Sequence, residues 1–251
     1  MAQEHPRDHR EEHPHPVALV TGAGRGIGRA IALALAREGY SLCIAARTRE
    51  ELEETRRLSQ LPIERALIVL IDLADEDSAD AVIETALDLF GRIDVLVNNA
   101  GWAPPRTALT KMRAEDASRI LAVNLRASIA LARAAAVSMA ERGSGAIINI
   151  ASSAARNLAA GEAVYAASKA GLVAFTHAAF AELGDRGIKV SVIIPGLVDT
   201  GLIPNNKRLD RTLMLSPDDV AAAVLDIVKS PARVCPIEVV LHPQRRPERA
   251  K

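Results

Sequence analysis

From residue 17 onward, short and almost continuously apolar runs alternate with longer stretches in which apolar residues recur at helical spacing. The short runs predict strands at 17–20, 41–46, 67–71, 93–97, 146–150, 188–194 and 237–241. The stretches between them predict helices at 25–38, 49–58, 76–90, 118–141, 164–183 and 217–229. Strands that are apolar on both faces and separated by helices indicate a parallel sheet covered on both sides. The pattern therefore predicts one α/β domain over residues 17–242, a doubly wound, seven-stranded parallel sheet flanked by helices.

The two ends of the chain depart from this pattern. Residues 1–16 contain four histidines and three prolines and little that could anchor them in a core, so we expect a disordered tail. His5, His9 and His13 stand four residues apart, as ligands on a helix would, but the neighbouring prolines oppose that helix, and no metal site is predicted. Residues 243–251 form a basic tail that we expect to be solvated.

Composition narrows the class of protein. The chain has 251 residues, and its 31 Lys and Arg balance 31 Asp and Glu, which argues against a broadly basic face for nucleic acid. The apolar runs fall short of the ~20 residues of a membrane span, and the first residues lack the apolar segment of a secretory signal. Cys43 and Cys235 lie far apart in apolar surroundings and are interpreted as buried, reduced thiols. We therefore expect a soluble cytoplasmic protein without a nucleic-acid or membrane partner.

A glycine-rich motif, Thr21-Gly22-Ala23-Gly24-Arg25-Gly26-Ile27-Gly28, lies between the first strand and the first helix. Glycines at this place permit a tight turn and a close approach of the backbone to a pyrophosphate, and the N-terminus of the helix supplies free N–H groups. A P-loop ATPase is disfavoured because no Gly-Lys-Ser/Thr follows the turn. The motif in this context predicts a Rossmann-type dinucleotide-binding domain.

The tip of the second strand favours one cofactor. An acid there would bind the 2′-hydroxyl of NAD, whereas an arginine suits the 2′-phosphate of NADP. The strand ends in Ala45-Ala46-Arg47 without an acid, and Arg25 in the glycine loop is a second candidate cation. The alternative is that both arginines are ordinary solvated charges. We expect NADP(H) to be favoured over NAD(H).

Candidate acid–base residues lie farther along the chain. Tyr165 and Lys169 are four apart at the start of a helix and therefore share a face, about 6 Å apart along its axis. A nearby ammonium favours the phenolate, so Lys169 could lower the pKa of Tyr165. The alternative is a packing tyrosine and a surface lysine. Ser152 follows a buried strand at the sheet edge where ligands of such folds bind, and Asn124 is a polar residue in an apolar helix.

These motifs closely resemble, in order, those of the short-chain dehydrogenase/reductase family, in its subgroup of ~250-residue chains that includes the 3-oxoacyl-ACP reductases. The matching pieces are the TGxxxGxG loop at Thr21–Gly28, Asp72, NNAG at Asn98–Gly101, Asn124, Ser152, the YxxxK pair Tyr165 and Lys169, Pro195-Gly196 and Thr200. The resemblance implies that Tyr165 is the general acid, that Ser152 hydrogen-bonds the substrate oxygen, and that Lys169 holds the nicotinamide ribose. Asn124 is implied to support a water of the proton relay.

The same resemblance completes the predicted cofactor site. Its residues are Gly22, Gly24, Arg25, Gly26, Ile27, Gly28, Arg47, Asp72, Leu73, Asn99, Ala100, Gly101, Tyr165, Lys169, Pro195, Gly196, Val198 and Thr200. The family also implies a homodimer or homotetramer built on the helices that contain Asn124 and Tyr165. Trp102 could wall the substrate pocket or simply pack, and His177 is expected in the core or on the dimer face.

The leading hypothesis is an NADP(H)-dependent oxidoreductase that reduces a ketone or 3-oxoacyl carbonyl to an alcohol, without a metal. The alternative is a catalytically inactive nucleotide sensor or scaffold, but such a protein would be expected to lose the Tyr, Lys or Ser. Two departures from the family pattern leave substrate size and the tetramer open: the segment Gly201–Ser216 is short, and the C-terminal end lacks the usual glycines.

Overall fold

The computed structural model describes residues 13–201, 203 and 209–247, and it confirms the predicted α/β fold. A seven-stranded, wholly parallel sheet has the order β3-β2-β1-β4-β5-β6-β7. The strands are β1 Val17–Thr21, β2 Ser41–Ala46, β3 Ala66–Leu70, β4 Val95–Asn98, β5 Gly145–Ile150, β6 Ile188–Pro195 and β7 Glu238–Leu241. The helices are α1 Gly26–Arg37, α2 Arg49–Ser59, α3 Ser78–Phe90, α4 Ala114–Leu121, α5 Ala127–Arg142, α6 Ala163–Leu183 and α7 Pro217–Lys229.

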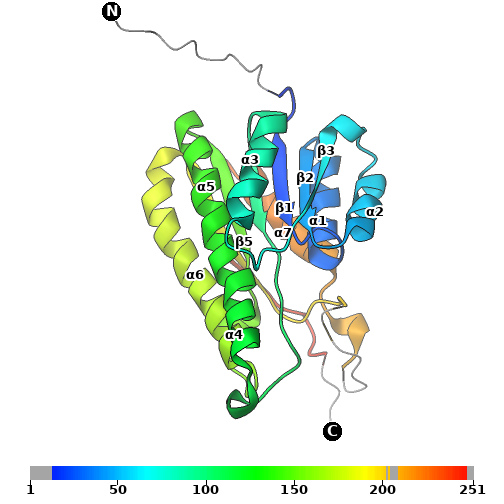
Figure 1. Ribbon diagram of the computed structural model, residues 1–251, viewed down its shortest axis with the longest axis vertical. Helices are drawn as coiled ribbons and strands as arrows, with labels where there is room; N and C mark the ends of the chain where they lie inside the picture. Colours follow the sequence, from blue (N-terminus) through cyan, green and yellow to red (C-terminus); the bar gives the residue numbers. More distant parts are fainter. Residues whose placement is uncertain (1–12, 202, 204–208, 248–251) are drawn as a thin grey trace, which may run out of the picture.

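The helices form one layer on each face of the sheet (Figure 1). In the fully buried strand β1, Ala18 and Val20 belong to the core beneath α1, α2 and α7, whereas Val17 and Leu19 belong to the core beneath α3, α5 and α6. Successive strand residues point to opposite faces, so a strand between two helical layers must be apolar at every position. This is why the apolar run alone located the strand.

One strand begins later than its apolar run predicts. The expected strand 93–97 is observed as Val95–Asn98, although Ile93 is buried. Asp94 intervenes, and its carboxylate accepts a hydrogen bond from the backbone N–H of Val17 at 2.7 Å. The backbone of Asp94 also donates to the carbonyl of Val17 at 2.8 Å and accepts from the N–H of Ala146 at 2.9 Å, so Ile93 is buried just outside the hydrogen-bonded part of the strand.

The predicted helix 118–141 is a longer helical stretch with an irregularity inside it. It begins at Ala114 and contains a π-helical turn, Ala122–Arg126, between α4 and α5. By length and composition this stretch, Ala114–Arg142, is apolar enough to cross a membrane, with 44% of its most apolar window buried. Ile120, Leu131 and Met139 are among its residues in the core of the domain, and α5 packs on α3 and α6. The apolar character of the stretch is that of a core helix.

The N-terminal tail lies mostly outside the described residues. Its last part, 13–16, is described, and there the structure differs from the expected disorder. The ring of His13 packs edge-on against Phe90 at a centroid distance of 5.1 Å, and the backbone carbonyl of Pro16 accepts a hydrogen bond from Ser41. The packing of the His13 ring on Phe90 holds this part of the tail against the domain, a contact that the composition of the tail did not indicate.

The two cysteines are free thiols in different environments. Cys43 is fully buried in β2, as expected, and burial raises its pKa to about 12, so it stays a protonated thiol. Cys235 is instead only partly buried and lies before β7, where its sulfur is 3.7 Å from the hydroxyl of Ser191.

Candidate active site

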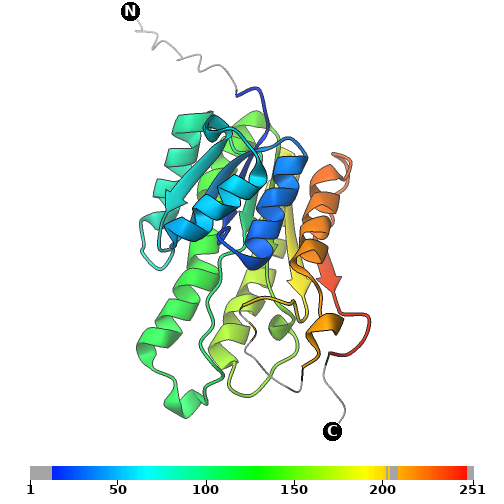
Figure 2. The same cartoon turned by 90° about the vertical axis from the view of Figure 1, so that its right-hand side faces the viewer.

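The predicted site residues follow the carboxyl ends of adjacent strands. The glycine loop leaves β1 and the NNAG segment leaves β4, and these two strands are neighbours at the point where the chain order of the sheet reverses. Ser152 follows β5 and Gly196 follows β6, so they lie on the same edge. In Figure 2 this is the lower edge, beyond which α6 and the helical stretch through α4 extend. Ligands of open α/β sheets bind at such an edge, beside the reversal.

The glycine loop is braced by the NNAG segment. The hydroxyl of Thr21 accepts hydrogen bonds from the backbone N–H groups of Asn99 and Ala100, both at 3.1 Å. In return the side-chain amide of Asn99 donates to the carbonyl of Thr21 at 2.9 Å. Both segments therefore keep one fixed relative position at the edge of the sheet.

The loop has the features that a dinucleotide phosphate requires. Gly22 and Gly26 have φ values of +64° and +55°, which favour glycine. Arg25 precedes α1 without a side-chain cap, and the first turn of α1 contains no acid. The N–H groups at this helix end therefore suit an anion, and the residues present fit the expected cofactor.

Gly28 leaves no room for a side chain. A Cβ atom there would lie 2.2 Å from the carbonyl oxygen of Gly22 and 2.4 Å from Nδ2 of Asn99. We therefore expect Gly28→Ala to lower the thermal midpoint of unfolding and to abolish dinucleotide binding, because the loop and its brace must separate. Gly184→Ala is the matched control, since its Cβ would meet only Phe180, at 3.4 Å or more. Equal melting and binding of the two variants would contradict this interpretation of the loop.

Two residues that were not predicted from the sequence form hydrogen bonds to the backbone of the glycine loop. The hydroxyl of the fully buried Thr55, in α2, donates to the carbonyl of Ala23 at 2.9 Å. Arg29, in α1, donates from Nε to Thr55 at 3.0 Å and from Nη2 to the carbonyl of Gly24. An amphipathic helix pattern gives no signal for such side-chain contacts to a distant backbone.

The predicted adenosine end carries more charges than expected. Arg47 is exposed at the tip of β2, as predicted, whereas Arg25 lies 3.7 Å from a carboxylate oxygen of Glu51. Asp72 forms an ion pair with Arg119 at 2.7 Å. Burial pushes the pKa of Asp72 upward, but hydrogen bonds from the Ala74 N–H and Arg119, with the charge of Arg47, outweigh it and lower the pKa.

Leu73, predicted for the cofactor site, and Trp102, a candidate for the wall of the substrate pocket, have other surroundings. Leu73 is only 7% exposed and belongs to the core. Trp102 stacks under Arg119, whose guanidinium carbon lies 5.8 Å from the centroid of the ring, so Arg119 links Trp102 to Asp72. The indole thus faces a cation, an arrangement that the sequence did not indicate.

Tyr165 forms a hydrogen bond with Ser152, and Lys169 lies one turn farther along α6, but the predicted charge interaction between Lys169 and Tyr165 is not found. Lys169 is buried, its Nζ donates to the carbonyl of Ile150 at 2.9 Å, and burial lowers its pKa to about 8. Burial raises the pKa of Tyr165, against the opposing effect of a hydrogen bond with Ser152 and with a smaller contribution from the charge of Glu162. The expected lowering of the Tyr165 pKa by Lys169 is therefore not found in this structure.

Asn124 is fully buried within the π-helical turn. Its Oδ1 accepts from the backbone N–H of Trp102 at 2.7 Å, and its Nδ2 donates to the carbonyl of Trp102 at 2.9 Å and to Ser168 at 3.3 Å. A Cβ on Gly101 would lie 3.6 Å from Oδ1 of Asn124 and 3.7 Å from Nζ of Lys169. The amide of Asn124 and the ammonium of Lys169 therefore both approach Gly101, at ordinary contact distance from where a side chain would begin.

The segment after β6, residues 196–200, runs from the end of β7 to the glycine loop. Gly196 donates its N–H to the carbonyl of Leu241 at 2.8 Å, Val198 is buried, and Thr200 lies against the glycine loop, 3.5 Å from the Cβ position of Gly26. Arg211, another residue that sequence reasoning missed, donates to Asp199 at 2.6 Å and to the carbonyl of Thr200 at 2.9 Å. Arg211 thereby fixes Thr200 beside the loop.

Among residues 13–201, 203 and 209–247, no group of three or more His, Cys, Asp or Glu side chains could hold a metal ion. The side chains at this edge instead offer the phenol of Tyr165, the hydroxyls of Ser152 and Thr200, the amide of Asn124 and the ammonium of Lys169, next to the glycine loop. Such groups can bind a phosphorylated cofactor, orient a carbonyl or hydroxyl group and exchange a proton with it.

Comparison with known proteins gives consistent results. The profile of the family described as short chain dehydrogenase matches residues 16–210. An uncharacterized oxidoreductase of Staphylococcus aureus (strain USA300) is 34% identical over 227 residues, which are 90% of this chain and 96% of that protein. The ketoacyl reductase HetN of Nostoc sp. (strain PCC 7120) is 38% identical over 215 residues, which are 84% of this chain and 75% of that protein. A metagenomic short-chain oxidoreductase, solved in complex with NADP, superposes with a TM-score of 0.80 at 34% identity, over 92% of this chain and 98% of its own.

Proposed function

Because the chain belongs to the short-chain dehydrogenase/reductase family, we propose that it is an NADP(H)-dependent oxidoreductase that reduces a ketone or 3-oxoacyl carbonyl to an alcohol, with Tyr165 as the general acid. The observation that carries the proposal is the hydrogen bond between Tyr165 and Ser152, with the buried ammonium of Lys169 one helical turn farther along α6, at the sheet edge that also carries the glycine loop. NADPH supplies the hydride when it is bound.

The protein's own groups would manage the charge and the proton. As a carbonyl carbon gains hydride, its oxygen gains negative charge, which the hydroxyls of Ser152 and Tyr165 meet with hydrogen bonds. The raised pKa of Tyr165 keeps its phenol protonated near neutrality, as a proton donor requires. Lys169 would hold the nicotinamide ribose. Asn124 holds the backbone of Trp102, so that the NNAG segment keeps its position.

We expect NADPH to bind at least ~10-fold more tightly than NADH, a difference of about 1.4 kcal/mol. The exposed Arg47 at the tip of β2, where no acid is present, supports this preference. So does the metagenomic relative that was solved with NADP. Arg47→Asp should weaken NADPH binding much more than NADH binding, as titration of both cofactors would measure. Equal or reversed affinities in the wild type would refute the assignment of NADP(H).

The substrate class is tested by NADPH oxidation with a panel of ketones, aldehydes and acetoacetyl thioesters. The ketoacyl reductase relative supports including thioesters. The competing function is a catalytically inactive nucleotide sensor or scaffold on the same fold. The presence of Tyr165, Ser152 and Lys169 together favours the enzyme, and turnover of any panel member would exclude the competing function.

A homodimer or homotetramer built on α5 and α6 also remains a prediction, as does a cytoplasmic location. Val137 of α5 and Leu121, just before the π-helical turn, are exposed apolar residues of this helical stretch. His177 of α6 is not in the core but exposed, with its Nε2 3.2 Å from a carboxylate oxygen of Glu238. Sedimentation equilibrium would report the oligomeric state directly.

A further inference from the structure

One of the two arginines predicted to bind the 2′-phosphate has an acidic neighbour. Nη1 of Arg25 lies 3.7 Å from Oε1 of Glu51. The same carboxylate lies over the glycine loop, because a Cβ on Gly24 would be 2.9 Å from the Cβ of Glu51 and 3.0 Å from its Oε2. The negative charge of Glu51 therefore lies beside the loop that is proposed to bind an anionic cofactor.

The backbone of Glu51 is fixed in this position. Its carbonyl accepts a hydrogen bond from Nη2 of Arg29 at 3.2 Å and lies 3.0 Å from the hydroxyl oxygen of Thr55, whose single proton it shares with the carbonyl of Ala23 in the glycine loop. Nη2 of Arg29 also donates to the carbonyl of Gly24 in that loop. Glu51 lies in the first turn of α2, where the helix dipole favours an acid. Because the loop and this turn are tied to the same two side chains, the carboxylate cannot leave without a rotation of its own side chain.

We propose that Glu51 is a specificity-determining residue. Its carboxylate competes with the 2′-phosphate of NADP(H) for Arg25 and so reduces the preference of the protein for NADP(H) over NAD(H). This inference rests on the proposed NADP(H) binding. A phosphate monoester carries a charge of about −1.5 to −2 at pH 7 and is repelled by a nearby carboxylate. Binding must also free Arg25 from Glu51. The 2′-hydroxyl of NAD(H) is uncharged and meets neither obstacle.

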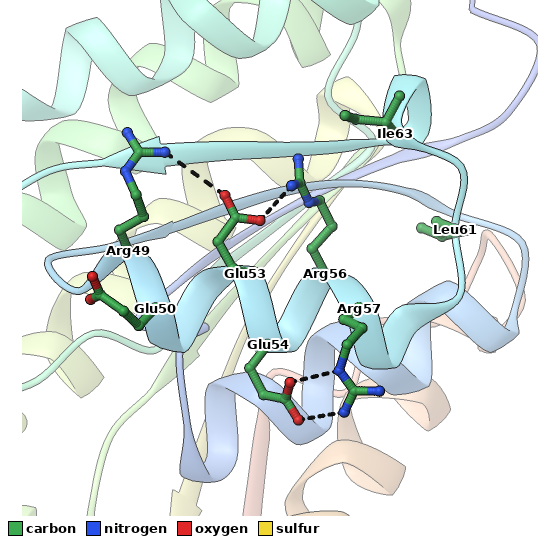
Figure 3. A pocket seen from close by; sticks show the side chains of 8 residues that line it. All are labelled: Arg49, Glu50, Glu53, Glu54, Arg56, Arg57, Leu61 and Ile63. Carbon is green, nitrogen blue, oxygen red and sulfur yellow. Dashed lines mark hydrogen bonds and ion pairs between the residues drawn. The ribbon is translucent and has the colours of Figure 1, made fainter.

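The same helix offers a matched control on its outer side. Figure 3 shows Glu53 and Glu54 in a surface hollow, each in ion pairs with arginines of α2 itself. Glu53 lies 3.8 Å from Arg49 and also pairs with Arg56, and Glu54 lies 2.7 Å from Arg57. Glu53→Gln therefore removes the same charge from the same helix without touching Arg25 or the loop.

The test is the dissociation constants of NADPH and NADH for the wild type, Glu51→Gln and Glu53→Gln at low salt. We expect Glu51→Gln to tighten NADPH binding about three- to fivefold, the upper part of the range for one exposed charge interaction. Its NADH affinity should change less than about twofold, and Glu53→Gln should change neither. At 1 M salt the gain should shrink, because the Debye length there is only about 3 Å.

Two further measurements separate the possible outcomes. In an Arg25→Gln background the gain from Glu51→Gln should fall, because the competition for Arg25 is gone. Unliganded melting temperatures check that each variant is folded, and glutamine keeps the shape of the side chain. Unchanged or weaker NADPH binding by a folded Glu51→Gln would overturn the inference, since Glu51 would then be neutral or would preorganise Arg25. A wild type that binds neither cofactor would instead refute the proposed function.

Discussion

Replacing Tyr165 by phenylalanine is expected to lower turnover by about 10²–10⁴-fold, the usual contribution of a positioned general acid. NADPH affinity should stay nearly unchanged, because the ring still packs in its partly buried position and only the phenol oxygen is lost. The hydroxyl of Ser152 would lose its hydrogen-bonding partner without losing its place beside the site. The measurement is the rate of NADPH oxidation with a substrate of the wild type, alongside a titration of NADPH.

Ser168→Ala serves as the comparison, because the Ser168 hydroxyl donates to the backbone carbonyl of Tyr165 and does not replace the phenol. Its effect should be much smaller than that of Tyr165→Phe. Turnover by Tyr165→Phe within a few-fold of the wild type would show that another group donates the proton.

Lys169→Ala is expected to weaken NADPH binding and turnover together, since its ammonium is proposed to hold the nicotinamide ribose and so to position the hydride. The substitution also leaves the carbonyl of Ile150 without its buried donor, so some loss of stability accompanies the loss of function.

The pKa of Lys169 gives this prediction a dependence on pH. Burial lowers that pKa to about 8, so the side chain is charged below this pH and neutral well above it. Only the charged form makes charge-assisted hydrogen bonds to a ribose. NADPH affinity of the wild type should therefore be full near pH 7 and decline as the pH rises through about 8. In Lys169→Ala this decline should be absent; the same decline in the variant would assign it to another group.

Most of the fold followed from hydrophobic pattern because both faces of the sheet are covered. Ser41–Ala46 and Pro217–Lys229 have the bounds that the pattern predicted. The C-terminal helix begins with a capping box between Ser216 and Asp219 and with Pro217 in its first turn, which are strong local signals. The start of β4 was misplaced because Ile93 is buried without belonging to the strand, and an apolar run reports burial rather than pairing.

The site was predictable where chemistry resides in short motifs and unpredictable where it depends on distant contacts. The glycine loop and the Tyr165–Lys169 pair are local in sequence and were found. Arg29, Glu51 and Arg211 act on the backbones or charges of other segments, and an arginine or glutamate on a helix surface gives no local signal of that contact. The predicted lowering of the Tyr165 pKa was wrong for the same reason. Burial raises that pKa, and burial depends on the packing of the whole site rather than on the four-residue spacing of Tyr165 and Lys169.

Deuterium transfer from NADPH that carries the label at both hydrogens of the reactive nicotinamide carbon would follow the hydride itself. With any ketone or thioester that the wild type consumes, we expect an alcohol product that carries the label on its carbinol carbon, in amounts equal to the NADPH oxidised, and its formation at least about 100-fold more slowly by Tyr165→Phe. NADPH that binds tightly but is not oxidised with any member of the panel, or is oxidised without labelling an alcohol, would show that the protein does not reduce a carbonyl.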